Sequence, residues 1–458
     1  MRTSLFTLLV AAGTFVRSEV ISIPLQKRFQ HRSHEVLSLL KRDAFNLSAQ
    51  NIISAGGYYS DIEVGTPGQK LTLHLDTGSS DTWVNSVASD ICNDTALIGC
   101  DRFFSPNDSS TYQLTNSGGL NITYLDTRNI LGNIFNDTLR IAGVEIDNQQ
   151  LGLANNDAKH QGVLGLGPST GSSSPEQYPT IVENMAARGH ITRAAFSMYL
   201  NTLQASAGNV LFGGIDTMKY IGYLATLPIE NIISPSSPIQ TYVATISEIS
   251  FNSSARDSIL TPGNVTAIFD SGSTVTLLPS DMATDIFAAL PVSLVLEAAF
   301  INCDLANDAD FGFSLNFAFG NTTIKVPFRE LILDNLGPYS DILATLNVPE
   351  NSCLFGIQSS ALVGLPSEPA LALLGDTFLR SAYVVYDMPN LQLGIAQANP
   401  NATESNIVEL EAGATELPAI QGVEAEEEDP GESVSVKISP PVQFAVLAVV
   451  FLQCAFLL

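Results

Sequence analysis

The clearest hydrophobic pattern lies at 71–75, where leucine at each odd position alternates with Thr72 and His74. A period of two is typical of a strand with one buried face. The segment runs directly into Asp-Thr-Gly-Ser-Ser at 76–80, and a second apolar run at 267–269 enters Asp-Ser-Gly-Ser-Thr at 270–274 in the same way. The pattern predicts two strands, each ending in a glycine-containing turn that begins with an aspartate.

Each of these turns is followed later in its half of the chain by an apolar-apolar-Gly segment, at 163–165 and at 373–375. By average composition, an Asp-[Ser/Thr]-Gly triplet arises by chance roughly 0.2 times in a chain of this length, and it is then an ordinary turn. Two copies with matching later segments indicate an internal duplication. We therefore expect two similar lobes that meet on a pseudo-twofold axis.

The duplicated turns predict a specific chemistry. Symmetry would bring the carboxyls of Asp76 and Asp270 side by side, where two like charges cannot both ionise readily and the pair shares one proton. One carboxyl can then deprotonate a bound water while the other protonates the carbonyl oxygen of a peptide. This chemistry requires no cofactor, no metal and no covalent intermediate.

With these motifs, residues 58–398 resemble the pepsin-family aspartic proteases, in the style of the fungal yapsin and candidapepsin groups. The resemblance also rests on Trp83, on the segment 208–216 with the Lys-Tyr pair at 219–220, and on the segments 374–380 and 384–387. It implies a mostly β, bilobal fold with a central cleft. It also implies that Asp76 and Asp270 are the catalytic pair and that Ser79 and Ser273 support them by hydrogen bonds.

Members of this family cover the cleft with a hairpin flap that carries a tyrosine, and Tyr124 is the best match. Its ring would pack over the substrate, and its hydroxyl would reach the indole of Trp83 directly or through a neighbour. The alternative is a half-buried strand tyrosine. The sequence 125–128, Leu-Asp-Thr-Arg, departs from the glycine-rich flap tip of the family, and Gln161 stands where relatives have aspartate.

Asp126 follows the flap tyrosine by two residues. Some fungal relatives have an aspartate there that helps accept lysine on the amino side of the scissile bond. This resemblance suggests cleavage after Lys or Arg, including dibasic sites. The alternative is an exposed turn residue with no role in binding.

Composition fits a large secreted protein. Hydrophobic residues make up 45% and charged residues 14%, which suits a well-buried core. Asp and Glu total 46 against 20 Lys and Arg. The negative field repels nucleic acid and favours cationic partners or an acidic milieu, although it also serves simply to keep an extracellular surface soluble.

The amino-terminal part contains two processing signals. Residues 1–18 have a basic Arg2, an apolar run and a polar end, which is the pattern of a signal peptide. Residues 19–42 are basic and end in a Lys-Arg pair, so we interpret them as a pro-segment cut after Arg42. Such a segment could lie across an acidic cleft by charge complementarity. The catalytic lobes are then expected at 43–230 and 231–398.

The carboxyl-terminal part resembles a tether. Residues 399–441 are polar and acidic and predict a disordered stalk, and 442–458 are almost wholly apolar. Small residues including Gly431 and Ser433, a polar spacer and an apolar tail fit a glycosylphosphatidylinositol attachment signal. The alternative is a retained helix, but 17 residues is at the short limit for a span, with no basic residue following it.

Cysteines and sequons agree with an oxidising, glycosylating compartment. The natural disulfide pairing is Cys92–Cys100 and Cys303–Cys353. Candidate glycosylation sites are Asn46, Asn93, Asn107, Asn121, Asn136, Asn252, Asn264, Asn321 and Asn401. Neither a Cys-x-x-Cys repeat nor a His-Glu-x-x-His motif supports a metal site.

Other enzyme classes fit poorly. Outside the pro-segment only His74, His160 and His190 are available to activate a nucleophile, without a Gly-x-Ser-x-Gly elbow. The remaining alternative is a non-catalytic surface protein whose cleft binds a protein or glycan. The sequence therefore predicts a monomeric, fungal-type aspartic endopeptidase at the plasma membrane or cell wall, with peptide and protein substrates and a lipid anchor as its membrane partner.

Overall fold

The computed structural model describes residues 20–29, 56–89, 102–125, 128–156, 161–174, 176–205, 207–232, 234, 236–252, 257–261, 263–307, 311–334, 336, 340–365 and 370–425. The chain divides into two compact units, Met1–Glu424 and Ala425–Leu458. All elements below belong to the first unit, since Ala425 is the last residue described.

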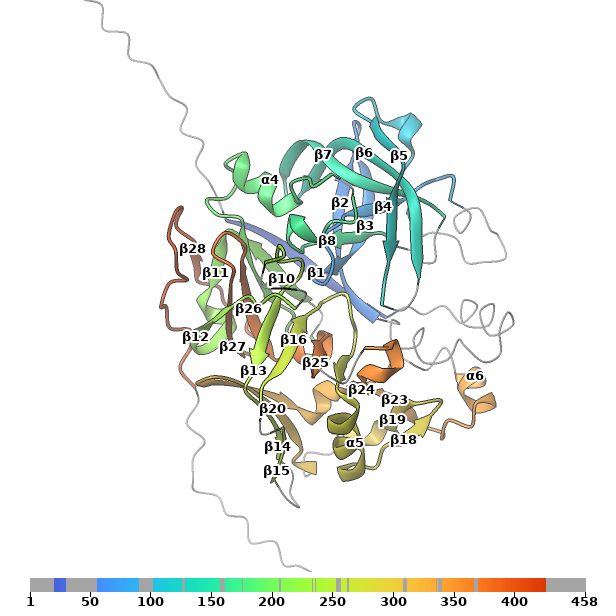
Figure 1. Ribbon diagram of the computed structural model, residues 1–458, viewed down its shortest axis with the longest axis vertical. Helices are drawn as coiled ribbons and strands as arrows, with labels where there is room; N and C mark the ends of the chain where they lie inside the picture. Colours follow the sequence, from blue (N-terminus) through green and yellow to red (C-terminus); the bar gives the residue numbers. More distant parts are fainter. Residues whose placement is uncertain are drawn as a thin grey trace, which may run out of the picture. The chain divides into compact units, whose positions relative to one another are not determined.

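Thirteen of the described strands form one sheet (Figure 1). In spatial order they are β12 (Tyr220–Pro228), β27 (Gln392–Ala398), β26 (Ala382–Asp387), β9 (Ala195–Tyr199), β10 (Ala207–Phe212), β1 (Ile21–Phe29), β2 (Gly56–Val64), β3 (Gln69–Asp76), β8 (Val163–Gly165), β4 (Trp83–Asn85), β7 (Val144–Asn156), β6 (Asn129–Ile141) and β5 (Gln113–Thr123). Strands from the beginning, middle and end of the first unit therefore share one hydrogen-bonded layer, which ties the two halves together.

The second half of the chain adds smaller sheets. One contains β13 (Val243–Ile246), β16 (Val265–Phe269), β25 (Leu371–Leu374), β17 (Thr276–Leu278) and β24 (Ile357–Ser359); another contains β15 (Asp257–Thr261), β14 (Glu248–Asn252), β20 (Ser314–Phe319) and β21 (Thr322–Pro327). A third contains β18 (Ser293–Val295), β19 (Ala298–Asn302), β23 (Ser352–Phe355) and β22 (Ile332–Leu333), and β11 (Gly214–Asp216) pairs with β28 (Ile407–Glu409). The described α-helices, from both halves of the chain, are short: α4 (Ile181–Ala187), α5 (Ser280–Ala289), α6 (Ser340–Thr345) and α7 (Asp376–Leu379). Strands thus outweigh helices, and the fold is mostly β, as predicted.

The predicted internal repeat is present in the strand pairing. In the first half β3 runs parallel to β8, so that Asp76 lies opposite Gly165. In the second half β16 runs parallel to β25, so that Phe269 lies opposite Leu374. Each apolar-apolar-Gly segment is therefore the neighbour of the strand that leads into an aspartate turn, which explains why the two motifs recur together in the sequence.

Strand β1 occupies a central place in the main sheet. It pairs with β10 along Ile21–Gln26 and with β2 along Gln26–Phe29. Its alternate side chains Ile21, Ile23 and Leu25 are buried, because a strand inside a sheet turns every second residue into the core. We expected the segment 19–42 to lie across a cleft, but its described part, residues 20–29, is a strand within the sheet; residues 30–42 lie outside the described residues.

The prediction of a disordered stalk from residue 399 is wrong for 399–425. This segment, which we call the carboxyl-terminal strap, packs on the first half of the chain through β28 and buries Leu410 and Leu417. It also covers the edge of β12, where Val423 N donates to Tyr220 O over 2.9 Å and Gly222 N to Val423 O over 2.9 Å. The acidic composition concealed two buried leucines, and the edge strand β12 gives the strap its backbone partners.

We predict that Leu410→Ala lowers the free energy of unfolding by about 2–5 kcal/mol, because it removes a fully buried side chain from the strap. The control is Ile407→Ala in the same segment, whose side chain is 48% exposed and whose loss should change stability by less than about 0.5 kcal/mol. Urea denaturation of both variants measures the difference. Equal effects would contradict the packing of the strap.

Candidate active site

Two turns at the ends of buried strands bring the predicted aspartates together. Asp76 is the last residue of β3, and Leu166 N donates to its backbone oxygen over 2.8 Å. Asp270 follows β16 directly, and its N–H donates to Leu374 O over 3.0 Å. The neighbouring strands β8 and β25 therefore fix both turns by backbone hydrogen bonds.

Side chains that the sequence interpretation did not single out join the two turns. Thr77 N donates to Ser271 Oγ over 3.1 Å, and Ser271 N donates to Thr77 Oγ1 over 3.0 Å. Thr77 Oγ1 also donates to Phe269 O and Ser271 Oγ to Leu75 O. Both residues are fully buried, so this reciprocal network holds the turns in one relative position. Their identical place within the two duplicated motifs was the signal that could have revealed them.

The glycines of the motifs allow the carboxyls to approach. A Cβ atom on Gly78 would lie 2.4 Å from Asp270 Oδ1, and one on Gly272 would lie 2.5 Å from Asp76 Oδ1. No side chain fits at these distances, because the opposing carboxyl is itself held by hydrogen bonds. Each turn thus makes room for the aspartate of the other.

Both carboxyls are buried and satisfied in the same way. Asp76 accepts from Gly78 N over 2.8 Å and from Ser79 Oγ over 2.5 Å. Asp270 accepts from Gly272 N over 2.8 Å and from Ser273 Oγ over 2.7 Å. Ser79 and Ser273 lie where the sequence placed them.

The environment favours one retained proton. Burial, followed by the charge of Asp76, raises the pKa of Asp270 from 3.8 to about 7, and the bonds from Ser273 and Gly272 oppose the shift. The pair therefore keeps a proton through the acidic range while offering a carboxylate at the same place. This is the state that general acid and base catalysis by two carboxyls requires.

The hairpin of β5 and β6 carries Tyr124 to this site. Trp83 Nε1 donates to Tyr124 OH over 2.7 Å, as the sequence predicted. Trp83 is fully buried in a small apolar cluster with Leu120 and Ile122 of the hairpin. Burial and then the charge of Asp76 raise the pKa of the Tyr124 hydroxyl, so it stays neutral while its oxygen accepts from Trp83. Asp126 lies outside the described residues.

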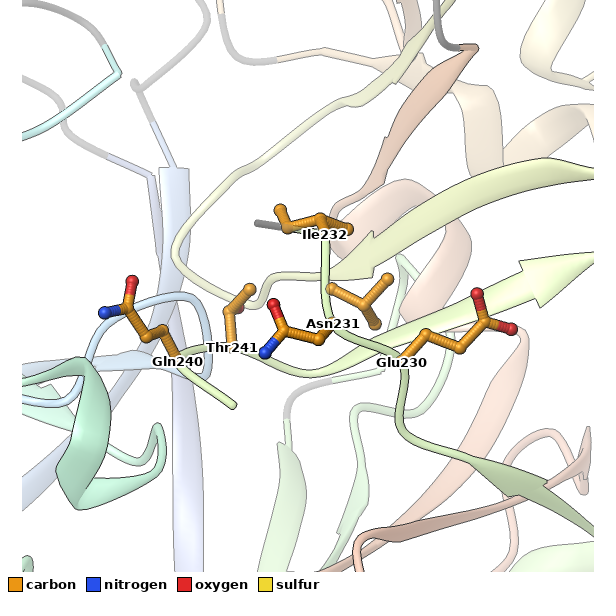
Figure 2. A pocket seen from close by; sticks show the side chains of 6 residues that line it. Glu230, Asn231, Ile232, Gln240 and Thr241 are labelled. Atoms are coloured by element: carbon orange, nitrogen blue, oxygen red, sulfur yellow. The ribbon is translucent and has the colours of Figure 1, made fainter. Parts of the chain in front are cut away.

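A small cavity lies in the connection between β12 and β13. Its volume is about 60 Å³, and it is lined by Glu230, Asn231, Ile232, Gln240, Thr241 and Val243. Figure 2 shows Glu230 and Gln240 at opposite ends of the lining. The connection contacts the end of the strand that leads into the second turn, where Phe269 N donates to Tyr242 O, and the segment after β8, where Thr170 Oγ1 donates to Ile239 O. The size of the cavity suits water or the end of a side chain.

A buried ionic cluster behind the second turn was not predicted. Arg380 Nε donates to Glu330 Oε2 over 2.7 Å, and both side chains are buried. Asp376, whose N–H donates to Ser273 O over 2.8 Å, is also buried, and burial holds its pKa well above the usual range. Lys27 of β1 lies in the same cluster, and burial lowers its pKa to about 7. Lys27 and Glu330 are far in sequence from each other and from Arg380, so no local pattern could link them.

The other predicted residues are placed as follows. Cys303 and Cys353 form a disulfide. His74 is buried and its ring lies 4.9 Å from that of Tyr59. The candidates that lie outside the described residues are Arg42, Asn46, Cys92, Asn93, Cys100, His160, Gly431 and Ser433.

A profile of the family described as "Eukaryotic aspartyl protease" matches residues 57–398, which include both aspartate turns and the hairpin. The chain belongs to this family. As in the predicted resemblance, the aspartyl protease fold accounts for the duplicated turns and the mostly β architecture.

Several fungal proteins are similar to this aspartyl protease. "Probable aspartic-type endopeptidase opsB" of Aspergillus fumigatus is 34% identical over 372 residues, covering 79% of this chain and 73% of the relative. "Acid protease" of Saccharomycopsis fibuligera is 35% identical over 347 residues, covering 74% and 80%. "Secreted aspartic protease 8" of Candida albicans is 32% identical over 365 residues, covering 78% and 79%. The protein is an aspartic-type endopeptidase.

Two further features of the aspartyl protease concern metals and membranes. The sulfurs of Cys303 and Cys353, which lie close to Asp334, are joined in the disulfide and offer no thiolate to a metal.

Within the part of the chain that the structure describes, none of the helices combines the length and the apolar character that crossing a membrane needs.

We predict that the stability of the wild type falls as pH rises from about 4 to about 7, and that Asp270→Asn makes this fall smaller. The native carboxyl binds its proton more tightly than the unfolded one, so the stability contributed by this proton is full below pH 3.8 and is lost as pH rises to about 7. Melting temperatures of the wild type and the variant at pH 4 and pH 7 test this. The exposed Asp281→Asn serves as control, and an unchanged pH dependence in Asp270→Asn would contradict it.

Proposed function

We propose that this aspartic endopeptidase uses Asp76 and Asp270 to hydrolyse peptide bonds at acidic pH. A water held between the carboxyls loses a proton to the ionised one and attacks the peptide carbonyl carbon. The protonated carboxyl gives its proton to the carbonyl oxygen, and the resulting diol collapses as the amine takes up a proton and leaves. The single observation that carries the proposal is the interlocked pair of buried, serine-bonded carboxyls.

The environment favours one proton shared by the two carboxyls. Burial and the neighbouring Asp76 raise the pKa of Asp270, and in a coupled pair the retained proton belongs to both groups. The carboxyl that is ionised when water binds serves as the base. Tyr124, bonded to Trp83, would close over the substrate and exclude bulk water from the reacting atoms.

We predict that Asp270→Asn lowers kcat for peptide cleavage at pH 3–6 by at least about 1000-fold, because the variant cannot exchange the shared proton. Cleavage of an unstructured peptide, with circular dichroism to verify folding, measures the effect. Wild-type activity should fall as pH rises through about 7, where Asp270 loses its proton. Exposed Asp281→Asn is the matched control.

The alternative function is a non-catalytic surface protein whose cleft binds a protein or glycan. It would be supported by unchanged peptide cleavage in Asp270→Asn, or by failure of the wild type to bind pepstatin. The intact carboxyl pair argues against it, because a binding cleft has no need for two buried carboxyls that share a proton.

We further propose a preference for substrates with Lys or Arg at the cleavage site. Two sequence features support it: Asp126, two residues after Tyr124 at the flap, and the formal net charge of −26. Negative charge around the cleft would attract basic peptides, and an aspartate near the flap would pair with the lysine ammonium.

We predict that Asp126→Ala lowers the ratio of kcat/KM for a Lys peptide over its Leu counterpart by about 10-fold, the loss of one partly desolvated ion pair. The peptides differ only at the residue on the amino side of the scissile bond. Asp108→Ala, an exposed aspartate elsewhere in the same lobe, controls for net charge. An unchanged ratio in Asp126→Ala would refute the role of this residue.

We propose that residues 19–42 keep the enzyme inactive until it is cut after Arg42. The place of β1 in the main sheet supports an ordered pro-segment, and Lys27 Nζ of this strand donates a hydrogen bond to Leu203 O. The chain beginning at Asp43 should then be more active than the uncut chain, and equal activity would exclude a zymogen.

We propose that the enzyme is secreted and held at the plasma membrane or cell wall by a glycosylphosphatidylinositol anchor at Gly431 or Ser433. The name of the Candida albicans relative, the signal-like residues 1–18 and the apolar tail 442–458 support this route. Because the strap ends near residue 425, the tether would begin after it. Release from cells by a phosphatidylinositol-specific phospholipase would distinguish the anchor from a retained helix.

A further inference from the structure

The flap hairpin carries a glycosylation sequon on its outer face. Asn121, Ile122 and Thr123 lie at the end of β5, directly before Tyr124. Leu120 and Ile122 are buried against Trp83, whereas Asn121 and Thr123 are exposed. Because side chains alternate along a strand, Asn121 and Thr123 share the face that points away from the indole.

A single side chain from the facing strand holds both sequon residues. Asn129 Nδ2 donates to Asn121 Oδ1 over 2.9 Å and to Thr123 Oγ1 over 2.9 Å. It also approaches Ile122 O at 3.3 Å. The amide of Asn121 is thus oriented through its oxygen, and none of the described residues is recorded as accepting a hydrogen bond from its Nδ2. The atom that a glycan would modify remains available in the folded hairpin.

The surroundings of Asn121 also suit a sugar. Its partner across the hairpin is Leu131, whose side chain is 41% exposed. Residues directly opposite in an antiparallel pair place their side chains on the same face within about 5.5 Å. A sugar attached to Asn121 would cover this apolar surface.

The second sequon of the hairpin offers a contrast. Asn136 on β6 is only half-exposed, and its Nδ2 donates to Asn148 Oδ1 over 3.0 Å. The threonine of that sequon, Thr138, is buried. Asn136 is therefore bonded within the fold through the nitrogen that a glycan would modify, whereas Asn121 is bonded through its oxygen.

We infer that Asn121 carries an N-linked glycan that makes the flap a size filter, admitting short peptides and unfolded segments and hindering folded proteins. The inference rests on the proposed passage through the secretory pathway. There, Asn121 Nδ2 loses a proton and bonds to C1 of an oligosaccharide, whose bond to a lipid pyrophosphate breaks. Asn121 lies three residues from Tyr124, about 10 Å in an extended chain, so the glycan would be attached close to the flap tyrosine but not at it.

The first test is occupancy. The full chain is secreted from a yeast host, treated with a peptide N-glycanase in heavy-oxygen water, and mapped by mass spectrometry. We expect modification at Asn121. A glycan at Asn107 or Asn252 with none at Asn121 would overturn this inference alone, and no glycan at any sequon would overturn the secretory route as well.

The second test is selectivity. Asn121→Gln and Thr123→Val both remove the sequon, whereas Thr123→Ser keeps it. We expect the first two to raise kcat/KM for a folded protein substrate severalfold through a lower KM, with kcat/KM for a short peptide unchanged. Thr123→Ser should behave as wild type, and so should Asn252→Gln, which removes a sequon that begins at the last residue of β14. An equal change for both substrates, or none for the folded protein, would overturn the filter.

Discussion

The reciprocal hydrogen bonds between Thr77 and Ser271 are the constraint on which the rest of this enzyme depends. Two lobes can present two carboxyls at contact distance only if the turns that carry them are locked together. Repulsion would otherwise separate the aspartates, and a separated pair would lose the shared proton. The buried threonine and serine supply this lock without adding charge. The two aspartate turns thus have the same geometry because of electrostatics as much as because of duplication.

The sequence predicted the site well because its chemistry is local. Fewer than ten residues contain an alternating apolar strand, the aspartate at its end and the glycine that follows. The repetition of this pattern identified both turns. Tyr124 and its bond to Trp83 followed from the same resemblance. Features that depend on distant residues were missed. Glu330 and Arg380 are 50 positions apart and pair only because the fold brings them together behind the second turn.

The two ends of the described chain show how composition can mislead. Residues 20–29 are part of a basic region, yet an alternating apolar pattern places β1 inside the main sheet. The strap is rich in acidic and small residues, yet Leu410 and Leu417 are enough to dock it where a strand edge offers backbone partners. Average charge predicted a segment lying across an acidic cleft in the first case and a disordered stalk in the second, whereas the spacing of a few apolar residues decided the outcome.

The strap has a mechanical consequence. A pull on the strap from its carboxyl-terminal end would first load the backbone hydrogen bonds that join Gly422 and Val423 to β12. These bonds lie at one end of the thirteen-stranded sheet, far along the strand order from the β3 turn that carries Asp76. A load would therefore peel the strap from the sheet edge before it could strain the interlocked turns. If the enzyme is pulled from this end, its two carboxyls therefore stay aligned until the strap has detached.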